Sequence, residues 1–159
     1  MLKKQIQETC NQKKELLLHY KQILYSEEDV KVKIILPILI TLGYDPCLDL
    51  NFEVSNKCGR IDIKINCNDI PVILEAKKLS LVLTNKETAQ LQTYMKAENV
   101  QLGILTNGKD WEFYTLNHYE PIKTINLEYG LYGDDLSFLS QFCKNKFNLN
   151  YFLSYNEFV

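Results

Sequence analysis

The sequence predicts an α/β fold of the mixed α+β kind, in which helices flank a central mixed β-sheet. First, apolar and polar residues alternate over 61–66, which is the period of a half-buried strand. Second, another short apolar run, 70–75, follows after a polar turn. Third, helix-start signals occur at Ser26 and at Thr84, on either side of this hairpin. We therefore expect helices and strands to be interspersed within one domain.

The length and composition are those of a single globular domain. The chain has 159 residues, 46% hydrophobic and 24% charged, enough to bury roughly two thirds of the surface that the unfolded chain exposes. The longest apolar run, 34–40, is interrupted by Pro37 and falls well short of the roughly 18 residues of a membrane span. Residues 1–25 lack the apolar segment of a signal peptide. We expect a cytoplasmic protein with no membrane partner.

Cysteine, histidine and charge content argue against several classes of protein. The five cysteines are an odd number with no Cys-x-x-Cys pair, and the two histidines stand apart, so neither a disulfide framework nor a zinc site is indicated. The net charge of −2 argues against tight DNA binding by this chain alone, because free-standing DNA binders usually carry a basic stripe. This charge does not exclude a protein that a partner delivers to DNA.

An N-terminal helical extension, 1–25, is expected to precede the main body, 26–159, within one globular unit. Its apolar residues lie near helical spacing, and lysines outnumber acidic residues. We expect a helix or helical pair that packs on its own domain. A helix that binds a partner or a second copy, and a basic surface that faces DNA, are the alternatives.

The first helix of the main body is expected over 26–42. Ser26 is a typical N-cap, and the acidic residues after it complement the helix dipole. Pro37 should kink the helix or shift its hydrogen bonding by a turn. Glu27 falls on the apolar side of the helix by residue spacing and is expected to point inward. That apolar stripe consists of Val30, Ile34, Ile38 and Leu42.

Alternating residues predict the first strand over 48–54, followed by a turn at 56–59. Glu53 on this strand could reach a site formed by the next hairpin, but an exposed strand position is the expected one.

The central hairpin, 59–78, brings two acids together. A two-residue turn at 68–69, Asn-Asp, uses residue types that tolerate positive φ and places Asp62 directly opposite Glu75. Lys77 shares their face. Like charges on opposed strand residues are destabilising, and a divalent cation such as Mg²⁺ would relieve the repulsion. The same register places six apolar residues on the other face: Ile61, Ile63, Ile65, Val72, Leu74 and Ala76.

The same charges also allow a simpler interpretation. Arg60 lies across from Lys77 in this register and could contact a backbone phosphate or be a surface charge. A surface hairpin with ordinary cross-strand ion pairs, Lys64 included, would contribute little to stability. Against this, Glu75 follows the apolar run 72–74, and a charge that emerges from a buried strand needs partners.

A second helix opens with the capping box at Thr84 and Glu87 and is expected to end near Glu98. Gln90 and Tyr94 lie one turn apart on one face. The purely structural interpretation is that Tyr94 is buried in the core and Gln90 lies on the surface.

The C-terminal half is expected to complete the sheet and cover it. The dipeptide Asn107-Gly108 predicts a two-residue hairpin loop. The expected elements are strands 100–106, 111–116 and 122–127, a helix 134–142 and an aromatic tail, 147–159, that folds back on the domain.

The spacing of Asp62, followed by twelve residues and then by Glu75-Ala76-Lys77, resembles the core motif of the PD-(D/E)xK nuclease superfamily. Further segments are similar to the N-terminal nuclease domain of type I restriction enzyme R subunits, and the resemblance spans roughly 26–114. It implies a restriction-endonuclease-like core. The segments are Ser26-Glu27 leading into Lys33–Pro37, Leu42–Asp45, Gln90–Tyr94 and Gly103–Gly108.

The resemblance also implies roles for individual residues. The implied catalytic residues are Asp62, Glu75 and Lys77. The implied metal ligands are Glu27, Asp62, Glu75 and the carbonyl oxygen of Ala76, with Glu28 as the alternative to Glu27. The residues implied to bind substrate or support the site are Gln90, Tyr94, Arg60 and Lys78.

The implied activity is Mg²⁺-dependent hydrolysis of DNA phosphodiester bonds, with Mn²⁺ as a substitute, by an endonuclease or nickase of restriction or phage defence. Implied partners are DNA, a second copy, or a separate motor or specificity subunit. A motor would have to be a separate subunit, because the sequence has no Walker loop. One alternative is a catalytically weak or inactive nuclease-fold module that binds nucleic acid or a partner subunit. Another is a small defence effector gated by oligomerisation.

Overall fold

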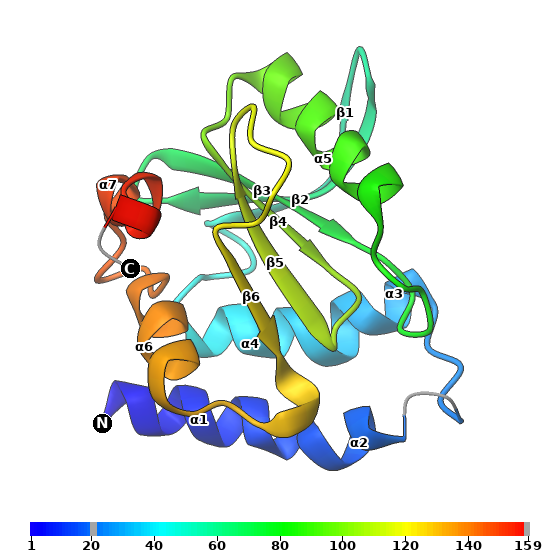
Figure 1. Cartoon of the computed structure of the whole chain (residues 1–159), viewed down its shortest axis with the longest axis vertical. Coiled ribbons are helices and arrows are strands. Elements are labelled where there is room, and N and C mark those ends of the chain that lie inside the picture. The colour runs from blue at the N-terminus through cyan, green and yellow to red at the C-terminus, as the bar shows by residue number, and fades with distance from the viewer. Residues whose placement is uncertain (20–21, 158–159) are drawn as a thin grey trace.

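A six-stranded mixed sheet lies between two helical layers in the computed structural model, which describes residues 1–19 and 22–157 (Figure 1). The strands lie in sequence order across the sheet, and only β3 and β4 are parallel. The predicted α/β fold with a mixed sheet and flanking helices is confirmed. The strands are β1 (Leu50–Asn56), β2 (Gly59–Cys67), β3 (Ile70–Ala76), β4 (Leu102–Thr106), β5 (Asp110–Thr115) and β6 (Lys123–Asn126).

The helices divide between the two faces of the sheet. α5 connects the two parallel strands and covers one face, whereas α1, α4 and α6 lie on the other (Figure 1). Among the described residues, no helix is both long and apolar enough to cross a membrane. The helical elements are α1 (Leu2–Gln12), α2 (Lys14–Leu18), α3 (Glu27–Val30), η1 (Lys31–Ile35), α4 (Leu36–Thr41), α5 (Asn85–Glu98), η2 (Leu127–Tyr129), α6 (Gly133–Gln141), α7 (Leu149–Leu153) and η3 (Tyr155–Glu157).

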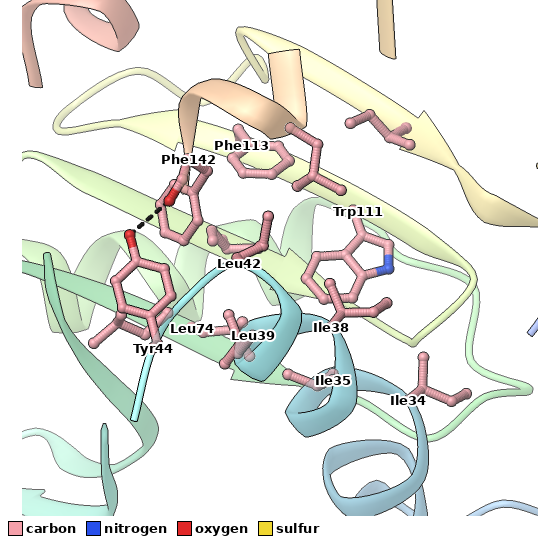
Figure 2. Close-up of a cluster of buried hydrophobic side chains, with 14 of the residues drawn as sticks. Ile34, Ile35, Ile38, Leu39, Leu42, Tyr44, Leu74, Trp111, Phe113 and Phe142 are labelled. Carbon is pink, nitrogen blue, oxygen red and sulfur yellow. Dashed lines mark hydrogen bonds between the residues drawn. The ribbon is translucent and has the colours of Figure 1, made fainter. Parts of the chain in front are cut away.

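The larger core fills the space between the sheet and α4. Ile35 and Leu39 approach the sheet residues Leu74 and Trp111, and all four are buried (Figure 2). This burial of apolar surface is the main source of stability, at roughly 1.5–3 kcal/mol for each fully buried large side chain. The hydroxyl group of Tyr44 donates a 2.6 Å hydrogen bond to the carbonyl oxygen of Phe142 at the edge of this core (Figure 2).

A smaller core lies beneath α5. Leu91 and Met95 pack on Ile73 and Leu105 of the sheet. Gly103 allows this close approach, because a Cβ there would lie 2.5 Å from the sulfur of Met95. α5 begins with the predicted capping box and ends at residue 98, as predicted.

The predicted break around Pro37 takes the form of a π-helical turn. The segment Lys31–Ile35 is π-helical and joins α3 to α4 in one continuous helical rod, with Pro37 in the first turn of α4. A π-turn is a one-residue widening of an α-helix and often occurs at functional sites. The predicted apolar stripe is buried at all four of its positions, Val30, Ile34, Ile38 and Leu42.

The N-terminal helices pack on their own domain, as expected. Ile6 and Cys10 of α1 and Leu17 of α2 are buried in the larger core. Residues 20–21 of the predicted extension, and the last two residues of the predicted tail, lie outside the described residues. Phe152 anchors the tail in the core, so the prediction that it folds back is confirmed.

Two local predictions are wrong. The first strand begins at Leu50, because Leu48 is 79% exposed and lies in the preceding turn. The β4–β5 loop contains three residues, 107–109, in place of the predicted two. The side chain of Asn107 accepts hydrogen bonds from the backbone N–H groups of Lys109 and Asp110, which stabilises this longer loop.

Candidate active site

The turn of the central hairpin has the geometry that its residue types predict. Residues 68 and 69 both have positive φ, 53° and 70°, as a two-residue hairpin turn requires. β2 and β3 pair in antiparallel register as far as Ile63 and Leu74. The predicted register is therefore confirmed as far as this pair, and Asp62 and Glu75 are the next residues along the two strands.

β2 and β3 separate at these two acids. The backbone N–H of Asp62 donates to Oε1 of Glu75 at 3.1 Å, and the N–H of Ala76 donates to Oδ2 of Asp62 at 2.8 Å. Ile61 packs in the core beneath α5, whereas Ile63 packs in the larger core. The prediction that Ile61 shares the apolar face of Ile63 is therefore wrong, since β2 twists where it leaves β3 and continues beside β1 alone.

Glu75 of this pair is buried, and Asp62 is largely shielded from solvent. Glu75 is 2% exposed and the side chain of Asp62 is 13% exposed. The pKa of Glu75 is raised from 4.5 to about 8, mainly by burial and to a lesser extent by the charge of Asp62. Burial also raises the pKa of Asp62, although the N–H of Ala76 and the charge of Lys31 oppose that shift. In the absence of a cation, the pair therefore retains a proton at neutral pH.

Lys77, which directly follows β3, connects this pair to α5. Its Nζ donates to Oε1 of Gln90 at 2.6 Å, and Nε2 of Gln90 donates to the hydroxyl oxygen of Tyr94 at 3.4 Å. The charge of Lys77 lowers the pKa of Glu75 and so opposes the effect of burial. The structure therefore brings Asp62, Glu75, Lys77 and Gln90 together.

Tyr94 and Gln90 fit the structural interpretation and also border the site. Tyr94 is 6% exposed and belongs to the smaller core, while Gln90 is exposed. A Cβ added at Gly59, where φ is +138°, would lie 2.9 Å from the hydroxyl oxygen of Tyr94. Tyr94 thus packs the β1–β2 hairpin closely against α5.

A buried lysine that the sequence interpretation missed faces Asp62. The side chain of Lys31, from the π-turn, is 6% exposed. Its Nζ lies 2.5 Å from Oε1 of Glu53, 3.0 Å from Oε2 of Glu28 and 3.9 Å from Oδ1 of Asp62. Burial lowers the pKa of Lys31, but hydrogen bonds to Glu53 and Glu28 and the charge of Asp62 outweigh it and raise the pKa to about 12. The Glu28-x-x-Lys31 spacing was its one signal in the sequence.

Glu53 occupies a partly exposed strand position, as expected, and also reaches the site. Its neighbours in β1 pair with Ile63 and Ile61, so Glu53 is level with Asp62. Its φ is +54°, an uncommon value for a residue other than glycine. The hydrogen bond from Lys31 lowers the pKa of Glu53.

Glu27 does not point inward, so that prediction is wrong. It is exposed as the first residue of α3, and the residue from this helical rod that lies near Asp62 is Lys31. The alternative ligand, Glu28, is exposed and pairs with Lys31. In residues 1–19 and 22–157, no group of three or more His, Cys, Asp or Glu side chains is placed to hold a metal ion.

The two basic residues predicted beside the site are both exposed. The guanidinium group of Arg60 lies 3.6 Å from the carboxylate of Glu53, and Arg60 pairs with Ser55 of β1. Its predicted position across from Lys77 is wrong, because β2 has already left β3 at this point. Lys78 directly follows Lys77, and a substrate contact from either exposed residue stays a prediction.

The donor types at Asp62 and Glu75 fit a hard divalent cation. One oxygen of each carboxyl group accepts a backbone N–H, which fixes the orientation of both groups. A divalent cation can replace the proton that these two oriented carboxyl groups hold between them. The chemistry of these residues therefore suits Mg²⁺, with Ala76 beside them at the end of β3.

Comparison with known proteins assigns the family. The sequence model of the type I restriction enzyme R protein N terminus (HSDR_N) matches residues 26–126, a span that runs from the N-cap of α3 to the end of β6. No match to the chain was found among curated proteins or among solved structures. The chain therefore belongs to the family of type I restriction enzyme R protein N-terminal domains.

Proposed function

We propose that this protein is a Mg²⁺-dependent nuclease that hydrolyses DNA phosphodiester bonds as part of a restriction system. The observation that carries the proposal is the convergence of Asp62, Glu75 and Lys77 where β2 and β3 separate, held by two backbone hydrogen bonds and by Gln90. Family membership supports the restriction setting. DNA and other subunits of a restriction complex are the proposed partners.

Each residue has a task in such a reaction. Asp62 and Glu75 would bind Mg²⁺, with the carbonyl oxygen of Ala76 as a further ligand. The bound cation supplies Lewis-acid stabilisation of a phosphate oxygen and lowers the pKa of a water molecule. Lys77 carries a positive charge beside the pair and would stabilise the negative charge that develops on the phosphate. Gln90 accepts from the ammonium group of Lys77 and so restricts its position.

Cleavage of supercoiled plasmid tests the proposal. Purified protein with Mg²⁺ is expected to nick or linearise the plasmid, and the Asp62→Asn and Lys77→Met variants are expected to lose activity by about 100-fold or more. Lys64→Met is the matched control, because Lys64 lies on β2 and pairs with Glu98 of α5 at 3.4 Å. Equal cleavage by Lys77→Met and Lys64→Met would refute the catalytic role of Lys77. Equal cleavage by Asp62→Asn and the unaltered protein would refute the proposed site.

A second candidate function is a non-catalytic module that binds nucleic acid or a partner subunit. The net charge of −2 favours it, and among the described residues no three acidic side chains are placed together to hold a metal ion. Calorimetric titration with Mn²⁺ separates the two functions. A nuclease should bind Mn²⁺ and lose that binding on Asp62→Asn, whereas no binding by the unaltered protein would favour the module.

A further inference from the structure

A positive charge is built into the site next to Asp62. The ammonium group of Lys31 is surrounded by the carboxylates of Glu28, Glu53 and Asp62. With 6% of its side chain exposed, Lys31 is close to fully buried. A buried ammonium group needs such partners, because an unpaired buried charge is strongly destabilising.

The three contacts are unequal. Nζ of Lys31 lies within hydrogen-bond distance of Glu53 and Glu28, at 2.5 and 3.0 Å, but 3.9 Å from Oδ1 of Asp62. The lysine therefore holds Glu53 directly and acts on Asp62 through its charge. Glu53 is level with Asp62 on the neighbouring strand, so without the charge of Lys31 these two carboxylates would repel each other, an effect that the exposed Arg60, 3.6 Å from Glu53, offsets in part.

We infer that Lys31 is a positioning residue: it holds the carboxylate of Glu53 in an ion pair, so that Asp62 and Glu75, without Glu53, bind one divalent cation per chain. Without this charge, Glu53 and Asp62 form a second pair of adjacent carboxylates, which is the donor set that a second divalent cation prefers. The inference rests on the proposed binding of a cation by Asp62 and Glu75.

Calorimetric titration of the 159-residue chain with Mn²⁺ measures the number of bound ions directly. The unaltered protein and the Lys31→Arg variant, which keeps the charge, should bind one Mn²⁺. The Lys31→Gln variant should bind two, and Lys31→Gln combined with Glu53→Gln should return to one. Lys33→Gln is the matched control, because Lys33 lies on the same rod, is half-exposed and pairs with Asp29 at 3.1 Å. It should bind one ion.

A second variant keeps the inference testable if circular dichroism shows that Lys31→Gln is unfolded. Glu53→Gln removes the negative charge from the shortest contact of Lys31, so its ammonium group is held less strongly and can move toward Asp62 and compete with the cation. The affinity for the single Mn²⁺ should then fall by about 10- to 100-fold, as when other groups that orient metal ligands are altered.

The possible failures can be told apart. A folded Lys31→Gln variant that binds one Mn²⁺ with unchanged affinity would overturn the inference about Lys31 and leave the proposed function standing. With an unfolded Lys31→Gln variant, unchanged affinity of Glu53→Gln for Mn²⁺ would do the same. Absence of Mn²⁺ binding by the unaltered protein would overturn both the inference and the proposed metal-dependent function.

Discussion

Replacing Glu75 by glutamine should stabilise the cation-free protein at neutral and alkaline pH. The pKa of Glu75 is about 8 in the folded protein, against an ordinary value of 4.5. The unfolded chain therefore releases this proton at lower pH than the folded protein does. The stabilising contribution of the protonated group is fully present below pH 4.5 and is lost as the pH rises toward 8. The Glu75→Gln variant stays neutral throughout this range.

The size of the effect follows from the same shift. One unit of pKa corresponds to about 1.36 kcal/mol, so the loss should be on the order of 3 kcal/mol by pH 7. Screening by solvent does not weaken this effect, because Glu75 is only 2% exposed. The amide oxygen of glutamine can still accept the hydrogen bond from the N–H of Asp62, so the substitution mainly removes the buried charge.

Urea denaturation in EDTA between pH 4.5 and 8 measures this prediction. The unaltered protein should lose stability as the pH rises, whereas Glu75→Gln should change much less and be the more stable protein at pH 8. Glu98→Gln controls for loss of a carboxylate at a partly exposed ion pair and should follow the unaltered protein. Parallel pH profiles of the unaltered protein and Glu75→Gln would show that Glu75 does not hold a proton when folded.

Two further substitutions test the packing that positions the site. Gly103→Ala should lower the free energy of unfolding by about 1–3 kcal/mol, because its Cβ would lie 2.5 Å from the sulfur of Met95 and 3.1 Å from Leu91; a urea midpoint equal to that of the unaltered protein would contradict this. Tyr44→Phe should cost about 1–3 kcal/mol, because it removes the 2.6 Å bond to the buried carbonyl oxygen of Phe142. Thermal denaturation measures that loss, and an unchanged midpoint would mean that this bond contributes nothing.

The close approach of Asp62 and Glu75 could be predicted because two local signals agree. The Asn-Asp turn accepts positive φ at both of its residues, 68 and 69, and the alternation of apolar residues permits only one register. The separation of β2 from β3 could not be predicted in this way. At Asp62 and Glu75, hydrogen bonds from backbone N–H groups to side chains replace the backbone-to-backbone bonds between the strands. The alternation of apolar and polar residues does not indicate where strand pairing ends.

The part of the site that comes from the helical rod was not predicted correctly, for a different reason. Placing Glu27 inward assumed α-helical geometry along the whole segment, whereas a π-turn occupies Lys31–Ile35. Glu27 is also the first helical residue, where a side chain lies at the open end of the helix. Lys31 was missed because a lysine between Val30 and Val32 gives no sign of burial, and its partner Glu53 is distant in sequence. Such a cluster is apparent only once β1 and the helical rod are brought together.

The π-turn also bears on how this segment tolerates changes in length. A π-turn contains one residue more than the α-helical turn it replaces. Deleting one residue between Lys31 and Ile35 would therefore let a regular α-helix form while α3 and α4 keep their phase around the rod axis. Inserting a further residue after Lys31 would instead rotate everything before it by about 100°, which would turn Lys31 away from Asp62. A one-residue deletion is therefore expected to be tolerated more readily here than a one-residue insertion.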